Sequence, residues 1–213
     1  MLELSKLKGE QLKLAKKIII KDSFDKLELI GGAEQSYTNY NLISAITVCD
    51  YKTMEIIEKS FAVVKVKVPY ISGFLAYREG QAISEAYSKL ESKPDVMLFK
   101  GNGILHPRGC GLASHIGVIL DQASIGIANH LLAGEVRGNK VYVDKELRGE
   151  IVITKEHSKP VYVSPGHKVS LKTSVEIVKK CVRLPHKMPE PLHLAHRYSR
   201  EILEEVSSGA ITV

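Results

Sequence analysis

The chain has 213 residues, 44% of them hydrophobic, and a formal net charge of +6 at pH 7. This length and apolar content are enough to bury a core, which predicts one domain over residues 1–213, and the positive charge suits an anionic partner such as nucleic acid. The cysteines, Cys49, Cys110 and Cys181, are far apart and form no Cys-x-x-Cys pair, so the sequence indicates neither a disulfide framework nor a zinc knuckle. We expect a reduced, cytoplasmic protein.

The first segment predicts an amphipathic helix that lies on the domain. Its helical spacing is carried, among several lysines, by Leu4, Leu7, Gln11, Leu14, Ala15 and Ile18. The lysines either contact phosphate or form a solvated helix face, and the sequence leaves both interpretations open. The apolar run 18–20 is far too short for a signal peptide or a membrane span, so we expect no membrane segment.

Extended segments follow, and they predict an antiparallel meander of three strands. The segments are Leu27–Gln35, Leu42–Asp50 and Met54–Val68. A helix is expected over Arg78–Ser92, before the short apolar run Val96–Phe99, which is typical of a buried central strand.

The rest of the chain alternates between loops, helices and short strands. A glycine-rich loop, Gly101–Gly111, precedes a helix over Leu112–Leu120 and a buried strand over Ser124–Ala128. Two or three further strands are expected around Val141, Ile151 and Val161, and closing helices over Ser170–Cys181 and Pro191–Glu205. This order predicts an α/β fold with a mixed central sheet, an antiparallel three-strand meander, and helices on both faces. A ribonuclease H-like core has this order, and so do other α/β folds.

The segment Val68–Glu79 carries the most distinctive pattern. Its tip, Pro69-Tyr70-Ile71, joins a proline, an aromatic and an aliphatic side chain. Such a tip can enter a base stack as a wedge, because an apolar side chain can replace the stacking partner of an extruded base. An ordinary proline-containing hairpin end is the alternative.

From about Leu29 to Ala195 the chain resembles the endonuclease V family, and several matching segments occur in the family's order. They are Pro69–Glu79, Gly101–Arg108, Gly111–His115, Gly126–Ala128, Gly166–Ser170, and Pro189–Pro191 with Ala195-His196. A dinucleotide-binding loop is excluded, because His106 stands where a G-x-G-x-x-G motif requires its third glycine.

The resemblance implies a protein that acts on DNA or RNA containing deaminated adenine. Pro69, Tyr70 and Ile71 would separate the strands as the wedge. Residues implied to bind the substrate around the extruded base are Gly73, Leu75, Gly101, Gly103, His106, Arg108, Gly111 and Leu132. Glycines suit that role because they let backbone groups approach a flipped purine.

The resemblance also implies a catalytic site with Mg²⁺, and here the chain departs from the family. Glu34 stands at the position of the family's first aspartate, and Lys100 stands where the family has a second aspartate before its glycine loop. Glu79 and His196 match a catalytic glutamate and a metal-side histidine. The implied catalytic set is Glu34, Glu79, Lys100 and His196, with Glu34 and His196 as metal ligands.

A carboxylate replaced by an ammonium changes the local charge by two units, which opposes binding of a divalent cation. We therefore expect Glu34 and Lys100 to lie on neighbouring strands and to form an ion pair in the place of the metal. Two other departures are Asn102 for a histidine and Asn129 for a lysine that faces the phosphate in the family.

Other polar residues have ordinary structural explanations. Asp50, Asp95 and Asp121 lie near strand ends, where one of them could be recruited as a metal ligand in a rebuilt site, but turns and helix ends are the expected explanation. His115 and His167 are expected to be structural.

The sequence leaves three functions open. The chain is a metal-dependent nuclease, or a module that binds inosine without cutting, or an interaction subunit with no preference for inosine over adenine.

Overall fold

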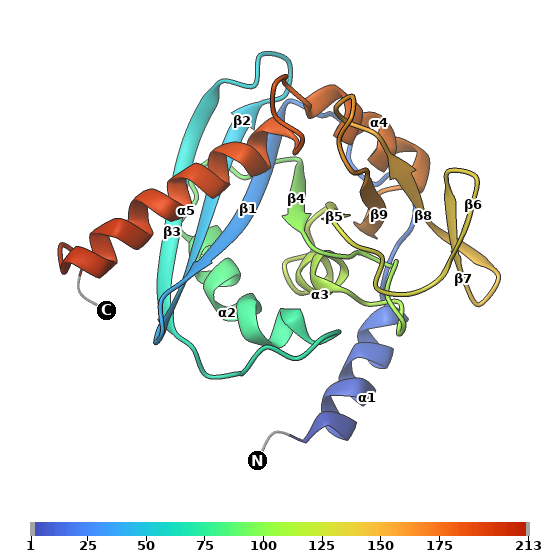
Figure 1. Ribbon diagram of the computed structural model, residues 1–213, viewed down its shortest axis with the longest axis horizontal. Coiled ribbons are helices and arrows are strands. Elements are labelled where there is room, and N and C mark those ends of the chain that lie inside the picture. Colours follow the sequence, from blue (N-terminus) through green and yellow to red (C-terminus); the bar gives the residue numbers. More distant parts are fainter. Residues whose placement is uncertain (1–2, 212–213) are drawn as a thin grey trace.

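The computed structural model describes residues 3–211, and its strands join in one mixed sheet. The sheet order is β3-β2-β1-β4-β5-β9-β8-β7-β6 (Figure 1). The strands are β1 (Leu29–Tyr37), β2 (Asn41–Asp50), β3 (Ile56–Lys65), β4 (Val96–Lys100), β5 (Ser124–Ala128), β6 (Glu135–Arg137), β7 (Lys140–Val143), β8 (Glu146–Val152) and β9 (Val161–His167). The helices are α1 (Leu4–Ala15), α2 (Leu75–Ser88), α3 (Leu112–Ile119), α4 (Leu171–Cys181) and α5 (Glu190–Ser208).

The strand pairings confirm the predicted mixed sheet. β1, β2 and β3 form the antiparallel meander, while β4 runs parallel to both β1 and β5. β9 then pairs antiparallel to β5. This is the sheet order of a ribonuclease H-like fold, as the sequence predicted.

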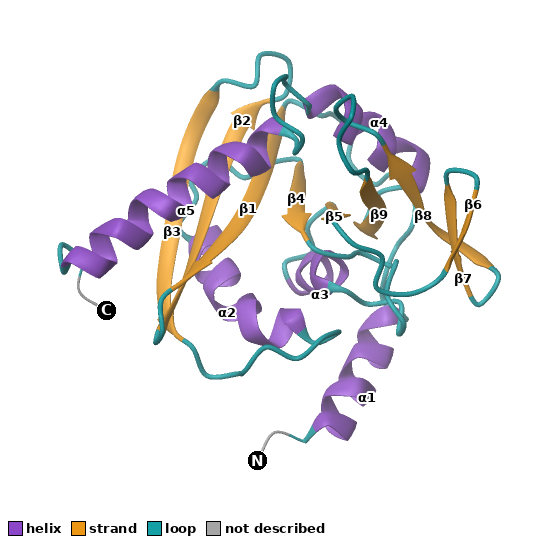
Figure 2. Cartoon of the chain, viewed as in Figure 1, coloured by secondary structure: helices purple, strands orange, loops and turns teal. Residues whose placement is uncertain are grey.

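Helices cover both faces of the sheet, and β4 shows why its sequence is continuously apolar (Figure 2). Met97 and Phe99 point to a core shared with α2 and α3. Val96 and Leu98 point to the opposite core, which contains residues of α4 and α5. Because alternate residues of a strand face opposite sides, a strand covered on both faces needs apolar residues throughout.

Two elements differ from the sequence prediction. α2 begins at Leu75, three residues before the expected Arg78, and ends at Ser88. Ala76 is buried against the sheet, so packing extends the helix toward the wedge segment. β6 was not predicted: its residues are all exposed, and it is held only by pairing with β7 around Gly138. An exposed strand lacks the apolar alternation on which the prediction rested.

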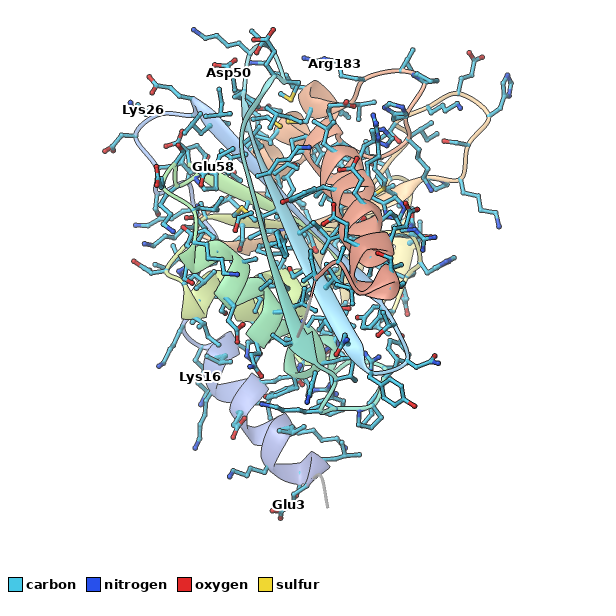
Figure 3. The ribbon with its side chains drawn as sticks, turned by 90° about the vertical axis from the view of Figure 1, so that its left-hand side faces the viewer. Glu3, Lys16, Lys26, Asp50, Glu58 and Arg183 are labelled. Carbon is cyan, nitrogen blue, oxygen red and sulfur yellow. The ribbon has the colours of Figure 1, made fainter. Side chains whose placement is uncertain are left out.

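The predicted N-terminal helix is present as α1, which extends from the body beside α3 (Figure 1). Its one buried residue is Gln11, whereas Lys16 at its C-terminal end is exposed (Figure 3). Within residues 3–211, no helix has the length and apolar character needed to cross a membrane.

Candidate functional site

Glu34 and Lys100 meet because β1 and β4 are adjacent parallel strands. Ala33 on β1 is paired with Phe99 on β4. The residues that follow them, Glu34 and Lys100, are therefore neighbours across the two strands. Lys100 Nζ lies 3.2 Å from Glu34 Oε1 and 3.3 Å from Oε2. The Glu34 side chain is 4% exposed and that of Lys100 is 40% exposed. The predicted ion pair is confirmed. Burial raises the pKa of Glu34, and the Lys100 ammonium acts against that rise.

Glu79 brings a second buried carboxyl group to this region from α2. The Tyr37 hydroxyl donates a hydrogen bond to its Oε1, while its Oε2 is buried without a hydrogen-bond partner. Burial raises the pKa of Glu79 to about 7, with a further contribution from the charge of Glu34. Around neutral pH this carboxyl group is therefore close to half protonated.

α5 approaches β1 closely, and this packing positions His196. A Cβ atom on Gly32 would lie 2.3 Å from the Pro191 carbonyl carbon, so only glycine permits the approach. Thr47 Oγ1 donates to the Pro191 carbonyl at 2.8 Å and anchors the start of the helix. One turn later His196 faces Glu34 and Lys100 across a cavity. Burial and the Lys100 charge lower the pKa of His196.

We call this space the histidine cavity. It has a volume of about 290 Å³ and is lined by Glu34, Lys100, Asn129, His186, Lys187, Met188, Leu192, His193 and His196.

The donor set around Glu34 does not fit a divalent cation. Within residues 3–211, no three His, Cys, Asp or Glu side chains are grouped so as to hold a metal ion. Both oxygens of Glu34 face an ammonium group, and Mg²⁺ requires near-octahedral oxygen ligands at roughly 2.0–2.1 Å. The ion pair therefore competes directly with a metal for the only carboxylate of the histidine cavity.

The other aspartates considered from the sequence do not rebuild the site. Asp50 accepts hydrogen bonds from the backbone of its own turn, and Asp95 accepts from the backbone amides of Glu28 and Leu29. Asp121 Oδ2 lies 2.7 Å from Lys168 Nζ. Their predicted roles in turns and at helix ends are consistent with these contacts.

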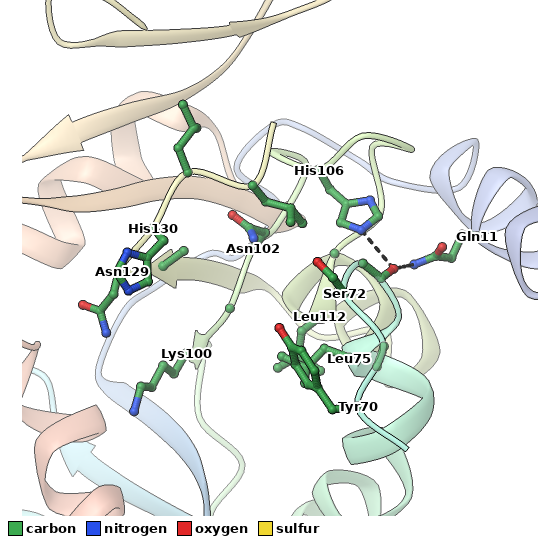
Figure 4. A pocket seen from close by; sticks show the side chains of 17 residues that line it. Gln11, Tyr70, Ser72, Leu75, Lys100, Asn102, His106, Leu112, Asn129 and His130 are labelled. Carbon is green, nitrogen blue, oxygen red and sulfur yellow. Dashed lines mark hydrogen bonds between the residues drawn. The ribbon is translucent and has the colours of Figure 1, made fainter. Parts of the chain in front are cut away.

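A second cavity, here called the glycine-loop cavity, lies between the wedge segment and the glycine-rich loop (Figure 4). Its volume of about 370 Å³ lies within the range typical of ligand sites. Of the residues predicted to bind the substrate, those lining it are Tyr70, Gly73, Leu75, Gly101, His106, Gly111 and Leu132. The structure thus gathers most of that set around one space.

Three donors converge on one backbone carbonyl at the back of this cavity. The Gly73 oxygen accepts from Gln11 Nε2 at 3.0 Å and from Arg108 Nη2 at 2.7 Å, and it lies 3.1 Å from His106 Nε2. The Arg108 amide donates to His106 Nδ1 at 3.2 Å, so the imidazole proton sits on Nε2. Burial lowers the pKa of His106 to about 4, so the ring is neutral at pH 7.

The remaining predicted residues have other positions. Pro69 and Ile71 do not line the glycine-loop cavity, and Arg108 lies behind it, where its guanidinium holds Gly73 and contacts Gln11 Oε1 at 2.6 Å. Gly103 is buried against β9, where its amide donates to Ser164 Oγ at 2.9 Å. Tyr70 is 70% exposed, as a wedge requires.

Sequence reasoning missed several residues of this cavity. Gln11 was assigned only to the helix face, although a polar residue at an apolar position of that pattern was the available signal. Ser72 and His130 gave no signal, because neither belongs to a periodic pattern. The other lining residues not predicted to bind the substrate are Ala76, Lys100, Asn102, Leu112, Ala128, Asn129 and Leu131.

His115 and His167 lie outside both cavities. The His115 ring packs edge-on against Tyr77, with ring centres 5.1 Å apart. His167 Nδ1 accepts from the Ile19 amide at 3.3 Å. Both contacts are structural, as expected.

Comparison with known proteins gives a consistent result over nearly the whole chain. The family model for endonuclease V matches residues 12–197. The endonuclease V of Dictyoglomus turgidum is 44% identical over 207 residues, which cover 93% of this chain and 90% of that relative. The endonuclease V of Thermofilum pendens is 38% identical over 202 residues, with 92% and 87% covered.

Solved structures of endonuclease V have the same fold. The catalytic domain of the human protein superposes with a TM-score of 0.87 at 29% identity, covering 97% of each chain. Endonuclease V of Ciona intestinalis, solved with a 24mer DNA containing an inosine followed by a ribo-adenosine, gives 0.86 at 30% identity, covering 95% of this chain and 98% of that one. This chain therefore belongs to the endonuclease V family, a family of metal-dependent nucleases with a ribonuclease H-like fold.

Proposed function

We propose that this protein recognises deaminated adenine in DNA or RNA through its wedge and its glycine-loop cavity, and that it binds without metal-dependent cleavage. The observation that supports the absence of cleavage is the ion pair between Lys100 and Glu34, in which Lys100 Nζ lies 3.2 Å from Glu34 Oε1. We further propose that the protein acts in the cytoplasm.

Recognition is supported by the arrangement of the wedge beside the cavity. Tyr70 is exposed, lines the glycine-loop cavity and stands beside Ser72 at its mouth (Figure 4). A base that leaves the duplex would enter the cavity while the tip Pro69–Ile71 fills the gap in the stack. The Ciona intestinalis relative was solved with inosine-containing DNA, which supports the same ligand class here.

The lack of cleavage follows from charge. Lys100 lines the glycine-loop cavity, the histidine cavity and a third cavity that contains Glu79. Lys100 therefore borders all three spaces. A divalent cation placed there would be repelled, since unit charges about 4 Å apart interact by roughly 4 kcal/mol at an effective dielectric of 20.

One observation favours the alternative function, which is Mg²⁺-dependent nicking. Glu79 Oε2 is buried without a partner, and an orphaned carboxylate oxygen is a typical metal or water ligand. In that alternative, Glu34, Glu79 and His196 would share the ion and Lys100 would turn toward solvent.

The test measures binding and nicking on matched probes with one inosine or one adenine, as duplex DNA and as single-stranded RNA. We expect the unmodified protein to bind the inosine probe at least roughly fivefold more tightly and to nick neither probe with Mg²⁺ or Mn²⁺. Lys100→Asp should acquire metal-dependent nicking, whereas the control Lys100→Asn, which removes the cation without adding a carboxylate, should not. Nicking by the unmodified protein would establish the alternative, and equal affinity for both probes would leave only an interaction subunit.

A further inference from the structure

The histidine cavity adjoins the glycine-loop cavity, and the two share Lys100 and Asn129. Figure 4 shows both of these side chains on the same side of the glycine-loop cavity, away from His106 and Gln11. A nucleotide whose base lies in the glycine-loop cavity would therefore place its backbone beside the histidine cavity.

The histidine cavity has an excess of positive charge. Its cationic side chains are Lys100 and Lys187, and its one carboxylate, Glu34, is paired with Lys100. None of the ion pairs formed by residues 3–211 includes Lys187. Burial and the charge of Lys159 lower the pKa of Lys187, which is the response of an ammonium surrounded by too little negative charge.

Lys187 is nonetheless held in place by a neutral partner. Its Nζ donates to Asn129 Oδ1 at 3.2 Å, across 58 residues of sequence. An ammonium has three donors, so two remain for a ligand after this bond. Asn129 follows β5 directly, and Lys187 lies in the loop before α5, so this bond joins the loop to the end of a central strand.

The wall beside Lys187 is also ordered. His186 and His193 stack with ring centres 3.4 Å apart, and His186 Nδ1 lies 3.2 Å from Glu190 Oε2. This stack forms the side of the cavity next to Lys187 and limits the movement of the loop that carries it.

We propose that Lys187, oriented by Asn129 and lining the same cavity as Lys100, binds a backbone phosphate of the nucleic acid whose extruded base occupies the glycine-loop cavity. The ligand class is a phosphodiester of DNA or RNA, and the inference rests on the proposed function for the identity of the base. Asn129 carries no charge, although it stands where the family has a lysine that faces the phosphate. Lys187, in the loop before α5, supplies the positive charge for this contact instead.

The experiment measures affinity against salt for inosine and adenine duplexes with Lys187→Ala, Lys187→Arg and the control Lys52→Ala. Lys52 is exposed in the turn after Asp50 and lines neither cavity, so Lys52→Ala removes the same charge outside both of them. Thermal melting of each variant checks that the fold is retained.

We expect Lys187→Ala to weaken binding roughly tenfold at low salt. It should also reduce the slope of log K against log salt by about 0.9, the value for one phosphate contact on duplex DNA. Lys187→Arg should retain the slope, and the ratio between the inosine and adenine probes should not change. A Lys187→Ala slope equal to that of Lys52→Ala would overturn the inference.

A neutral methylphosphonate at each phosphate flanking the inosine locates the contact. One such substitution should weaken binding of the unmodified protein and have no further effect on Lys187→Ala, because both changes remove the same interaction. Independent losses at every position would overturn the inference even if inosine is preferred. Coupling at one phosphate with no preference for inosine would instead support the phosphate site and contradict the proposed function.

Discussion

Glu79→Gln is expected to abolish a fall in stability of about 3 kcal/mol between pH 4.5 and pH 7. Glu79 is 4% exposed, and its pKa rises from 4.5 to about 7 on folding, mainly because burial disfavours its charged form. The folded state therefore binds more protons than the unfolded state in this window, so the free energy of unfolding decreases as pH rises through it. Glutamine keeps the size and an acceptor for Tyr37 but does not titrate.

The measurement is urea unfolding of both proteins from pH 4 to pH 8. The difference in unfolding free energy should grow from about pH 4.5 and level off near pH 8, about one unit above the pKa of Glu79 in the folded protein. Glu85→Gln, an exposed residue of the same helix, is the matched control and should follow the unmodified protein. Parallel curves for the unmodified protein and Glu79→Gln would show that the pKa of Glu79 is the same in the folded and unfolded protein, which would contradict the prediction.

Gly103→Ala is expected to destabilise the fold by about 3 kcal/mol. A Cβ atom at this position would lie 2.0 Å from the Pro165 carbonyl oxygen and 2.6 Å from its carbon, and both are backbone atoms that cannot rotate away. The glycine loop would have to move off β9, which would also break the bond from the Gly103 amide to Ser164 Oγ. Affinity for the inosine probe should fall with stability.

Gly9→Ala provides the opposite control. Gly9 lies inside α1 with no atom within 4 Å of the added methyl group, so the change should stabilise the protein by roughly 0.5–1 kcal/mol through the unfolded state and helix propensity. Equal melting temperatures for Gly103→Ala and the unmodified protein would show that the loop is not held against β9.

The two cavities of this chain differ in the chemistry of their walls. The neutral His106, the Gly73 carbonyl and the glycine loop form a space that suits a base, whereas Lys100 and Lys187 form a space that suits a phosphate. Under the two proposals above, the first space holds the base of a nucleotide and the second holds its phosphate. The ion pair between Lys100 and Glu34 has no net charge, so it does not supply the positive charge of a divalent cation.

Local patterns in the sequence were sufficient for the order of most elements. The meander, the buried strand β4 and the helices of both faces follow from apolar spacing, which depends on neighbouring residues alone. The pairing of Lys100 with Glu34 was also predictable, because both residues stand at positions where the resembled family has metal-binding aspartates.

The sites depend on contacts that no local pattern records. Gln11 reaches the Gly73 carbonyl 62 residues later, and Lys187 reaches Asn129 from 58 residues away. No repeating pattern in the sequence links residues so far apart. These contacts arise only when α1 docks beside α3 and α5 packs over β1.

By itself, therefore, the sequence determined the family, the sheet and the substitution of the metal-site aspartates. The tertiary structure alone decided which residues line each cavity, that Gly103 serves packing rather than the cavity wall, and that Lys187 is held by Asn129. The reason is physical: periodicity reports which face of an element is buried, whereas a binding site forms where loops from distant elements are brought together by the packing of the whole core.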